Sequence, residues 1–213
     1  LDNPGSFNFG KGIDCDGNGN PYVLLSFKDA VQINGTNFQS QGGNADPDLL
    51  LARFNPTNGQ TVWHKQIAGV DLAYPGGLSV SYSPVVNNYN VYITGYFYQT
   101  ATFAGNFIGN PLTSSGFNDV YVAKYSASNG NIAWAVKNGG GNGYESAVAI
   151  STDNGGNSFI TGTQLFSTAN FGCSSITAGG SDKLYVAKFN DQGAAQYAIQ
   201  PTGPGYGHGI VHA

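Results

Sequence analysis

The sequence contains three copies of one segment, and this repetition restricts the fold more than any other feature. Three runs with alternating apolar residues contain alanine at positions 52, 123 and 187, spaced 71 and 64 residues apart. After each run comes a turn with glycine and then an aromatic residue, namely Trp63, Trp134 and Tyr197. Repetition at a spacing of this size is typical of repeat architectures, in which each unit packs against its neighbours.

Each copy is predicted to contain four short β-strands. In the third copy we expect them at about residues 146–151, 157–163, 183–189 and 195–199, where β-branched and aromatic residues alternate between Gly, Asn and Ser turns. No segment shows a sustained helical period, and the 32 glycines would each cost up to ~1 kcal/mol in a helix interior. We therefore predict an all-β fold.

These units are predicted to stack as the blades of a β-propeller, because a four-stranded sheet cannot bury both faces alone. The blades would span about residues 9–73, 74–143 and 144–205, with the first strand of a fourth at 206–213. First strands would line a central channel and fourth strands would form the rim. Closed propellers have typically 4 to 8 blades. We therefore expect residues 1–213 to form one incomplete propeller domain, completed by remaining blades or by another copy of the chain.

Several motifs in these units resemble a known family. They are aromatic-x-x-x-aliphatic at Tyr144 to Val148, Asn-x-aromatic-Ile-Thr-Gly at Asn90 to Gly95, Thr-Ala-x-Phe-Gly at Thr168 to Gly172, Gly-x-x-Asp at Gly179 to Asp182, aromatic-Val-Ala-Lys at Tyr185 to Lys188, and Asn-Gly-x-x-x-Trp at Asn129 to Trp134. Together they resemble the SBBP-type bacterial β-propeller repeat. The resemblance implies a seven-bladed propeller in a large secreted or surface protein of Bacteroidetes-like bacteria, beside adhesion modules.

The resemblance is weaker in the first copy. There Leu24, Leu25 and Ser26 replace Ile-Thr-Gly, and Arg53 replaces the lysine. These changes are compatible with the same fold, but they argue against one binding site repeated in every unit.

Composition excludes several classes of partner. Eight Lys and Arg against twelve Asp and Glu give a net charge of −4, so no basic field favours nucleic acid. No apolar stretch approaches the ~20 residues that span a bilayer, so no membrane insertion is expected.

The chain begins at Leu1 and has no methionine, which predicts a piece of a longer protein. Two distant cysteines, Cys15 and Cys173, are expected to be unpaired thiols.

One segment has the spacing of a calcium loop. Asp14, Asp16 and Asn18 place oxygen side chains at alternate positions, as calcium loops do. Leu25 stands where an EF-hand would need a bidentate glutamate. A tight hairpin explains the Asn and Gly residues equally well. Calcium is thus the one possible cofactor, and no other is predicted.

Recurring aromatic and charged residues allow structural and functional interpretations. The aromatic set that begins each unit could form stacking platforms for sugars or wedges between units, and we favour wedges, as for Trp63, Trp134 and Tyr197. That set comprises Phe9, Tyr74, Tyr144 and Tyr206.

Charged residues recur around the third strand, and we expect the aspartates to cap turns and the cations to pair across unit interfaces rather than to form a ligand ring. They are Asp48, Asp119 and Asp182, with Arg53, Lys124 and Lys188.

The connections between second and third strands are the predicted ligand surface. They span 28–47, 98–118 and 164–181 and differ in sequence while the strands repeat. Binding residues are often carried by variable loops on a rigid scaffold. Aromatic residues among amides and hydroxyls suit glycans, and protein partners are the alternative. The candidate ligand-binding residues are Phe38, Tyr98, Phe107 and Phe117.

No catalytic constellation is recognisable. Glu145 is the only glutamate, although glycosidases need paired carboxylates, and no Gly-x-Ser-x-Gly elbow occurs. His208 and His212 lie in a strand-like segment without the glutamate of a zinc protease. We therefore predict a non-catalytic, extracellular or cell-surface module for binding, adhesion or scaffolding. The alternative is part of a secreted carbohydrate-active enzyme whose catalytic residues lie outside this chain.

Overall fold

The computed structural model is an all-β protein, as predicted. It describes residues 8–41, 47–69, 73–84, 86–105 and 110–211. Every regular element in these ranges is a β-strand. The described ranges contain no helix that is long and apolar enough to cross a membrane. The predicted fourth-unit strand at 206–213 is not assigned as a strand over the described residues 206–211.

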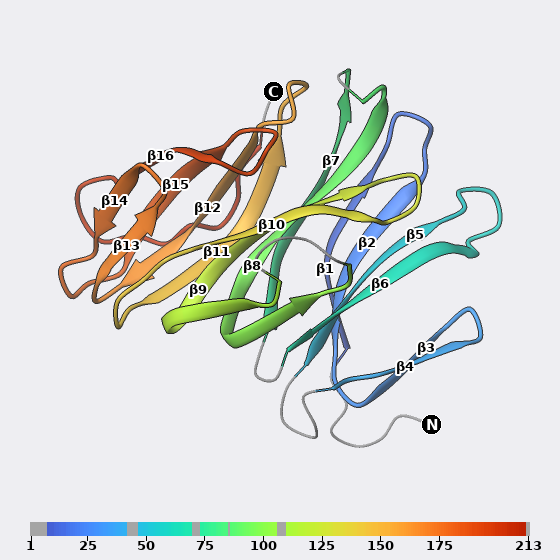
Figure 1. The fold of residues 1–213 in the computed structure, drawn as a ribbon, viewed down its shortest axis with the longest axis horizontal. Coiled ribbons are helices and arrows are strands. Elements are labelled where there is room, and N and C mark those ends of the chain that lie inside the picture. Colours follow the sequence, from blue (N-terminus) through green and yellow to red (C-terminus); the bar gives the residue numbers. More distant parts are fainter. Residues whose placement is uncertain (1–7, 42–46, 70–72, 85, 106–109, 212–213) are drawn as a thin grey trace.

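Twelve strands form three successive groups of four antiparallel strands, which we call units one, two and three (Figure 1). Unit one contains β1 (Asn8–Cys15), β2 (Pro21–Phe27), β5 (Asp48–Phe54) and β6 (Thr61–Gly69). Unit two contains β7 (Ala73–Ser83), β8 (Asn88–Phe103), β9 (Leu112–Ser126) and β10 (Ile132–Asn138). Unit three contains β11 (Tyr144–Thr152), β12 (Ser158–Leu165), β15 (Lys183–Phe189) and β16 (Ala195–Ile199). The four strands predicted in the third copy are thus confirmed to within two residues.

The connections between second and third strands form hairpins. Unit one carries β3 (Ala30–Ile33) paired with β4 (Thr36–Gln39), and unit three carries β13 (Thr168–Phe171) paired with β14 (Ser174–Thr177). In Figure 1 these two hairpins lie on opposite sides of the molecule. In unit two the long strands β8 and β9 extend into the connection and pair there at Thr100↔Thr113 and Ala101↔Leu112.

Pairs between units join the twelve strands into one mixed sheet. The end of β8 pairs with β6 of unit one, from Ile67↔Phe103 to Gly69↔Ala101, and β11 makes one parallel pair with β9 at Tyr144↔Asn118. The hairpin of unit three also reaches back to unit two, through the bridge Gly139↔Asn170. The connection between the second and third strands of unit two is therefore tied to unit one, and the corresponding connection of unit three is tied to unit two.

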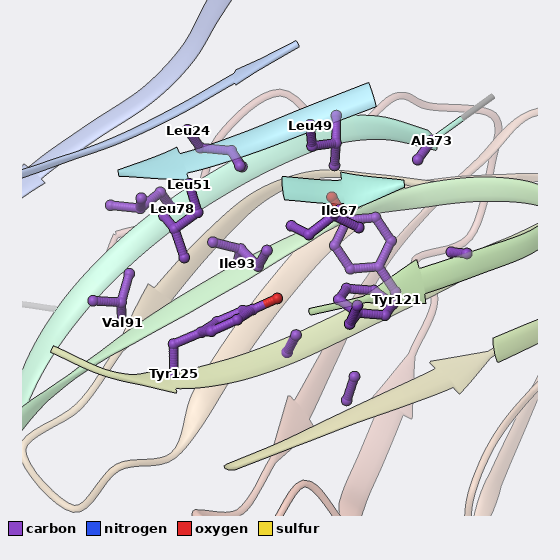
Figure 2. Packing of buried hydrophobic residues seen from close by; sticks show 14 of the residues in the cluster. Leu24, Leu49, Leu51, Ile67, Ala73, Leu78, Val91, Ile93, Tyr121 and Tyr125 are labelled. Atoms are coloured by element: carbon purple, nitrogen blue, oxygen red, sulfur yellow. The ribbon is translucent and has the colours of Figure 1, made fainter. Parts of the chain in front are cut away.

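Successive residues of each strand point to opposite sides of the sheet, so each sheet has two faces that can pack against neighbouring units. In β8 and β9 of unit two, Ile93 and Tyr125 belong to a core shared with unit one, whereas Tyr92 and Val122 belong to a core shared with unit three. Figure 2 shows the first core, where Leu51 and Ile67 of unit one meet Leu78 and Ile93 of unit two. Unit two is therefore covered on both faces.

Trp63 holds units one and two together. Its Nε1 donates to the carbonyl of Ala127 at 2.9 Å, and the guanidinium of Arg53 donates to the same oxygen at 3.4 Å. The indole lies on Gly130, where an added Cβ would come within 2.7 Å of the ring. Gly130 has φ +67, so both this close approach and its backbone conformation favour glycine.

The junction of units two and three has the same design. Trp134 Nε1 donates to the carbonyl of Asp191 at 2.9 Å, Lys124 forms an ion pair with the Asp191 carboxylate, and the indole covers Gly193. The prediction that the cations pair across unit interfaces is therefore confirmed for Arg53 and Lys124. Lys188 lies at the corresponding position of unit three, with its Nζ 5.1 Å from the ring centroid of Phe159.

The aspartates confirm the capping prediction in two units. Asp48 accepts a hydrogen bond from the amide of Gln41 at 3.1 Å, and Asp119 accepts one from the amide of Ser115 at 2.9 Å. Asp182 precedes β15 and differs, since its carboxylate accepts a hydrogen bond from the hydroxyl of Tyr206 at 2.5 Å.

Candidate functional site

Three adjoining cavities, of about 590, 520 and 330 Å³, form one groove along the beginnings of the first strands. Tyr96 lines all three, which makes the groove continuous. We call this surface the tyrosine groove. Its main lining residues are Phe9, Lys11, Tyr74, Tyr96, Tyr98, Asn118, Tyr144, Asp182, Tyr206 and His208.

Strand pairing brings the rings of the groove together. Tyr74 and Tyr96 are register partners in β7 and β8, and their rings stack with centroids 4.8 Å apart. Phe117 precedes Asn118, which pairs with Tyr144, so the rings of Phe117 and Tyr144 stack at 4.7 Å and 2°. The ring pairs therefore lie on rigid strands, and a bound molecule would meet a surface that is already ordered.

These rings remain accessible to solvent. Phe117 and Tyr144 are each 40% exposed, and Phe166 of unit three, which meets Tyr144 edge to face at 6.2 Å, is 58% exposed. Large apolar side chains gathered on one surface are typical of interaction sites, whereas scattered ones need no explanation. The groove therefore offers flat aromatic surface for stacking.

Polar groups line the groove beside these rings. Tyr206 donates to Asp182, and this hydrogen bond raises the pKa of the Tyr206 hydroxyl. Burial, followed by the neighbouring Tyr74, raises the pKa of Tyr96. Both phenols are therefore neutral hydrogen-bonding groups at neutral pH. Together with Asn118 they supply the few orienting polar contacts that ligand sites combine with apolar surface.

Two of the four ligand residues predicted from sequence lie at this groove. Tyr98 lines it, and Phe117 stacks on Tyr144 at its edge. Phe38 is only 8% exposed and packs against Phe27 and the ring of His64, so we do not include it in the ligand surface. Phe107 lies outside the described residues.

The wedge interpretation stays a prediction for the aromatic set that begins each unit. Phe9, Tyr144 and Tyr206 are 60%, 40% and 61% exposed, and Tyr144 contacts Phe117 of unit two and Phe166 of unit three. Trp63 and Trp134 do act as wedges, as predicted. Lys11 and Tyr96 were not predicted from sequence, although Tyr96 follows the Ile-Thr-Gly motif directly and that position could have signalled it.

The predicted calcium residues occupy the β1–β2 hairpin. Asp14 accepts from the amides of Cys15 and Val80, at 2.8 and 2.7 Å, whereas Asp16 accepts from Asn20 and Tyr22. Burial alone would raise the pKa of Asp16, but these hydrogen bonds, with one from the Asn18 amide, lower it. Within the described ranges, no group of three or more His, Cys, Asp or Glu could hold a metal. Calcium binding here remains a prediction.

Replacing Asp16 with alanine should lower the free energy of unfolding by about 2 kcal/mol, because buried donors would lose a charged acceptor. The pKa of Asp16 is lowered by folding, so its contribution is present above the ordinary value of 3.8 and disappears as the pH falls through the folded value. Urea unfolding at pH 7 and at pH 3 measures both effects. The difference between wild type and variant should shrink at pH 3, and a constant difference contradicts the role of the charge.

The two cysteines are free thiols, as predicted, and both are exposed. Cys15 ends β1, and Cys173 lies in the turn between β13 and β14.

Comparison with known proteins does not assign the chain to a family. No family model matches it, and no curated protein matches it.

Proposed function

We propose that the chain is a non-catalytic, extracellular β-propeller module that binds neutral glycans in the tyrosine groove. In this proposal it belongs to the SBBP type, on the motifs given above, and serves binding or adhesion within a larger secreted or surface protein. Three observations support different parts of the proposal.

Packing of the first strands supports the propeller arrangement. β1, β7 and β11 lie side by side: an added Cβ on Gly12 would come within 2.9 Å of Leu78, and one on Gly77 within 3.1 Å of Ile150. The fourth strands β6 and β10 carry the wedges Trp63 and Trp134. Close packing along the first strands and spacing by indoles along the fourth are what a radial arrangement of sheets requires.

The exposed, stacked rings of the groove are the observation that carries the glycan proposal. Tyrosine and phenylalanine rings offer flat apolar surface to the C–H faces of a pyranose, and their polar neighbours can bond its hydroxyls. The low charge of the chain gives no general attraction for polyanions. A neutral oligosaccharide therefore fits the groove better than an acidic one.

Replacing Tyr144 with alanine should weaken oligosaccharide binding at least tenfold, because it removes the ring that contacts both Phe117 and Phe166. A glycan array with neutral and acidic oligosaccharides identifies the ligand class, and titration calorimetry with the best soluble oligosaccharide gives the affinity. Tyr82→Ala is the matched control, since Tyr82 is 38% exposed but does not line the groove.

Three outcomes would contradict the proposal. They are absence of binding on the array, equal loss in the Tyr144 and Tyr82 variants, and preferential binding of acidic glycans. Turnover of a bound oligosaccharide by the purified chain would contradict the non-catalytic part and favour the enzyme alternative.

A further inference from the structure

The smallest of the three cavities in the tyrosine groove has walls unlike those of the other two. Its volume is about 330 Å³, and among the described residues that line it four are tyrosines, one is an asparagine and none is charged. The two larger cavities are both lined by a lysine, Lys11. We call the smallest cavity the tyrosine cage. Its walls are Tyr74, Tyr96, Tyr98, Asn118 and Tyr144.

Strand register gathers the walls of the cage on one face of the sheet. Tyr98 in β8 pairs with Asn118 in β9, and Asn118 pairs in turn with Tyr144 in β11. Tyr96 lies two positions before Tyr98 and pairs with Tyr74 in β7. Directly paired residues, and residues two apart on one strand, project to the same side of a sheet. Four aromatic rings are therefore placed around the short side chain of Asn118.

A β-bulge lies where Tyr98 enters the cage. The register between β8 and β9 shifts between Tyr98 and Thr100, and the intervening Gln99 has φ +52, a backbone conformation uncommon outside glycine. Bulges re-aim side chains and are frequent beside functional sites. The backbone therefore departs from regular pairing at the residue that completes the cage.

The cage has the chemistry that binds a quaternary ammonium group. The faces of tyrosine rings attract cations, and aromatic cages are the recurring receptors for N-trimethyl groups. A primary ammonium has three N–H donors that need acceptors once they leave water, whereas a trimethylammonium group has none. Since no carboxylate is among the described residues of the cage, the quaternary ion fits it better than a primary amine.

Two lysines lie beside the cage. The cavity of about 590 Å³ shares Tyr74 and Tyr96 with the cage, and it is also lined by Lys11 and Lys28. Neither lysine forms an ion pair with a residue that the structure describes. Ammonium groups of this kind bind phosphate oxygens through charge-assisted hydrogen bonds. A ligand that carries a phosphate next to a trimethylammonium group would therefore use both cavities.

We propose that the tyrosine groove binds a phosphocholine diester, with the trimethylammonium group in the tyrosine cage and the phosphate at Lys11 and Lys28. The diester carries one charge of each sign, so it is neutral overall and meets no net repulsion from a chain of charge −4. This inference goes beyond the proposed function, because the diester can belong to a substituted glycan or to a phosphatidylcholine headgroup.

Titration calorimetry with glycerophosphocholine, a soluble diester, tests the site. Glycerophosphoethanolamine carries the same charges but has a primary ammonium, so wild type should bind it at least tenfold more weakly. This comparison needs no variant and does not depend on how a substitution affects folding.

Two variants test the two halves of the site. Tyr98→Leu should weaken glycerophosphocholine binding at least tenfold, because Tyr98 lines the cage and neither larger cavity. Lys28→Gln should weaken it at least threefold through the phosphate. Tyr82→Leu and Lys65→Gln are matched controls, since they replace a partly exposed tyrosine and a half-buried lysine that do not line the groove. Both controls should bind as wild type does.

Two carriers distinguish the source of the diester. Co-sedimentation with phosphatidylcholine vesicles identifies a lipid headgroup, and capture on an oligosaccharide substituted with phosphocholine identifies a glycan. Binding to either carrier that free glycerophosphocholine displaces supports the site.

Three results would overturn the proposal. They are absence of glycerophosphocholine binding at millimolar concentration, equal affinity for glycerophosphoethanolamine, and wild-type affinity in the Tyr98 variant. Binding of unsubstituted neutral oligosaccharides would still leave the proposed function standing. Conversely, glycerophosphocholine binding without any oligosaccharide binding would remove the glycan proposal alone, so the two failures are distinguishable.

Discussion

Replacing Trp63 with alanine is expected to lower the free energy of unfolding by about 3–4 kcal/mol, the usual cost of deleting a buried tryptophan. Trp63 is 9% exposed, its ring centroid is 5.9 Å from that of Tyr22, and its Nε1 bonds the carbonyl of Ala127. The substitution therefore opens a cavity between units one and two and removes a buried hydrogen bond. Thermal and urea denaturation of dilute protein measure the loss.

Tyr197→Ala is the matched control for this prediction. Tyr197 has the same place in its unit but is 38% exposed, so we expect a loss below about 1 kcal/mol, as for other exposed side chains. Equal losses at positions 63 and 197 would show that the aromatic residue stabilises its own sheet rather than the junction.

The strands could be predicted from sequence because their signal is local. Alternation of apolar residues on either side of the Gln192-Gly193 turn placed β15 and β16 at the residues where the structure has them. The wedges Trp63 and Trp134 could also be predicted, since an aromatic residue that recurs in every unit must serve something that every unit needs.

The hairpins of the long connections could not be predicted in this way. The segments Ala30–Gln39 and Thr168–Thr177 are rich in Asn, Ser and Thr, and only one side of each hairpin is covered. Phe38 resembles an exposed loop residue until Phe27 and Leu50, from the second and third strands, enclose it. Its burial depends on a tertiary contact that no local pattern carries.

The groove exists because no turn of a neighbouring unit covers its aromatic rings. Tyr144 and Trp134 are both aromatic, yet only Trp134 has a turn of the next unit over it. The connection before Tyr144 contains Gly139, Gly140, Gly141 and Gly143, which bring no side chains to shield the ring. Ring exposure is thus set by packing between units, which no local pattern of the sequence shows.

Glu145 should make the protein less stable as the pH rises, and Glu145→Gln should abolish this effect. The carboxyl is fully buried beside the charge of Asp119. An added Cβ on Gly139 would lie 2.7 Å from Asp119 Oδ1 and 2.8 Å from Glu145 Oε2, so both oxygens face the same point. Burial first, and then Asp119, raise the pKa of Glu145 from 4.5 to about 8, although hydrogen bonds from Gly140 and Ser167 oppose the shift.

Between these two values the folded protein keeps a proton that the unfolded chain has released. The free energy of unfolding therefore falls as the pH rises from about 4.5 to about 8, by about 1.4 kcal/mol per pH unit and about 4 kcal/mol in total. Glu145→Gln removes the titrating group. The variant should match wild type near pH 4 and exceed its stability by about 3–4 kcal/mol near pH 8.5.

Urea denaturation of both proteins across this pH range gives the difference directly, and every other titrating group cancels in it. A gap that opens with pH identifies the buried proton of Glu145 as its source. A gap of constant size would instead mean that the two side chains differ only in packing, and a variant less stable than wild type at pH 8.5 would mean that the ionised carboxylate is bound there by a cation. Because Glu145 has no counterpart in units one and two, where Gly10 and Pro75 follow the aromatic residue, the effect belongs to the junction of units two and three alone.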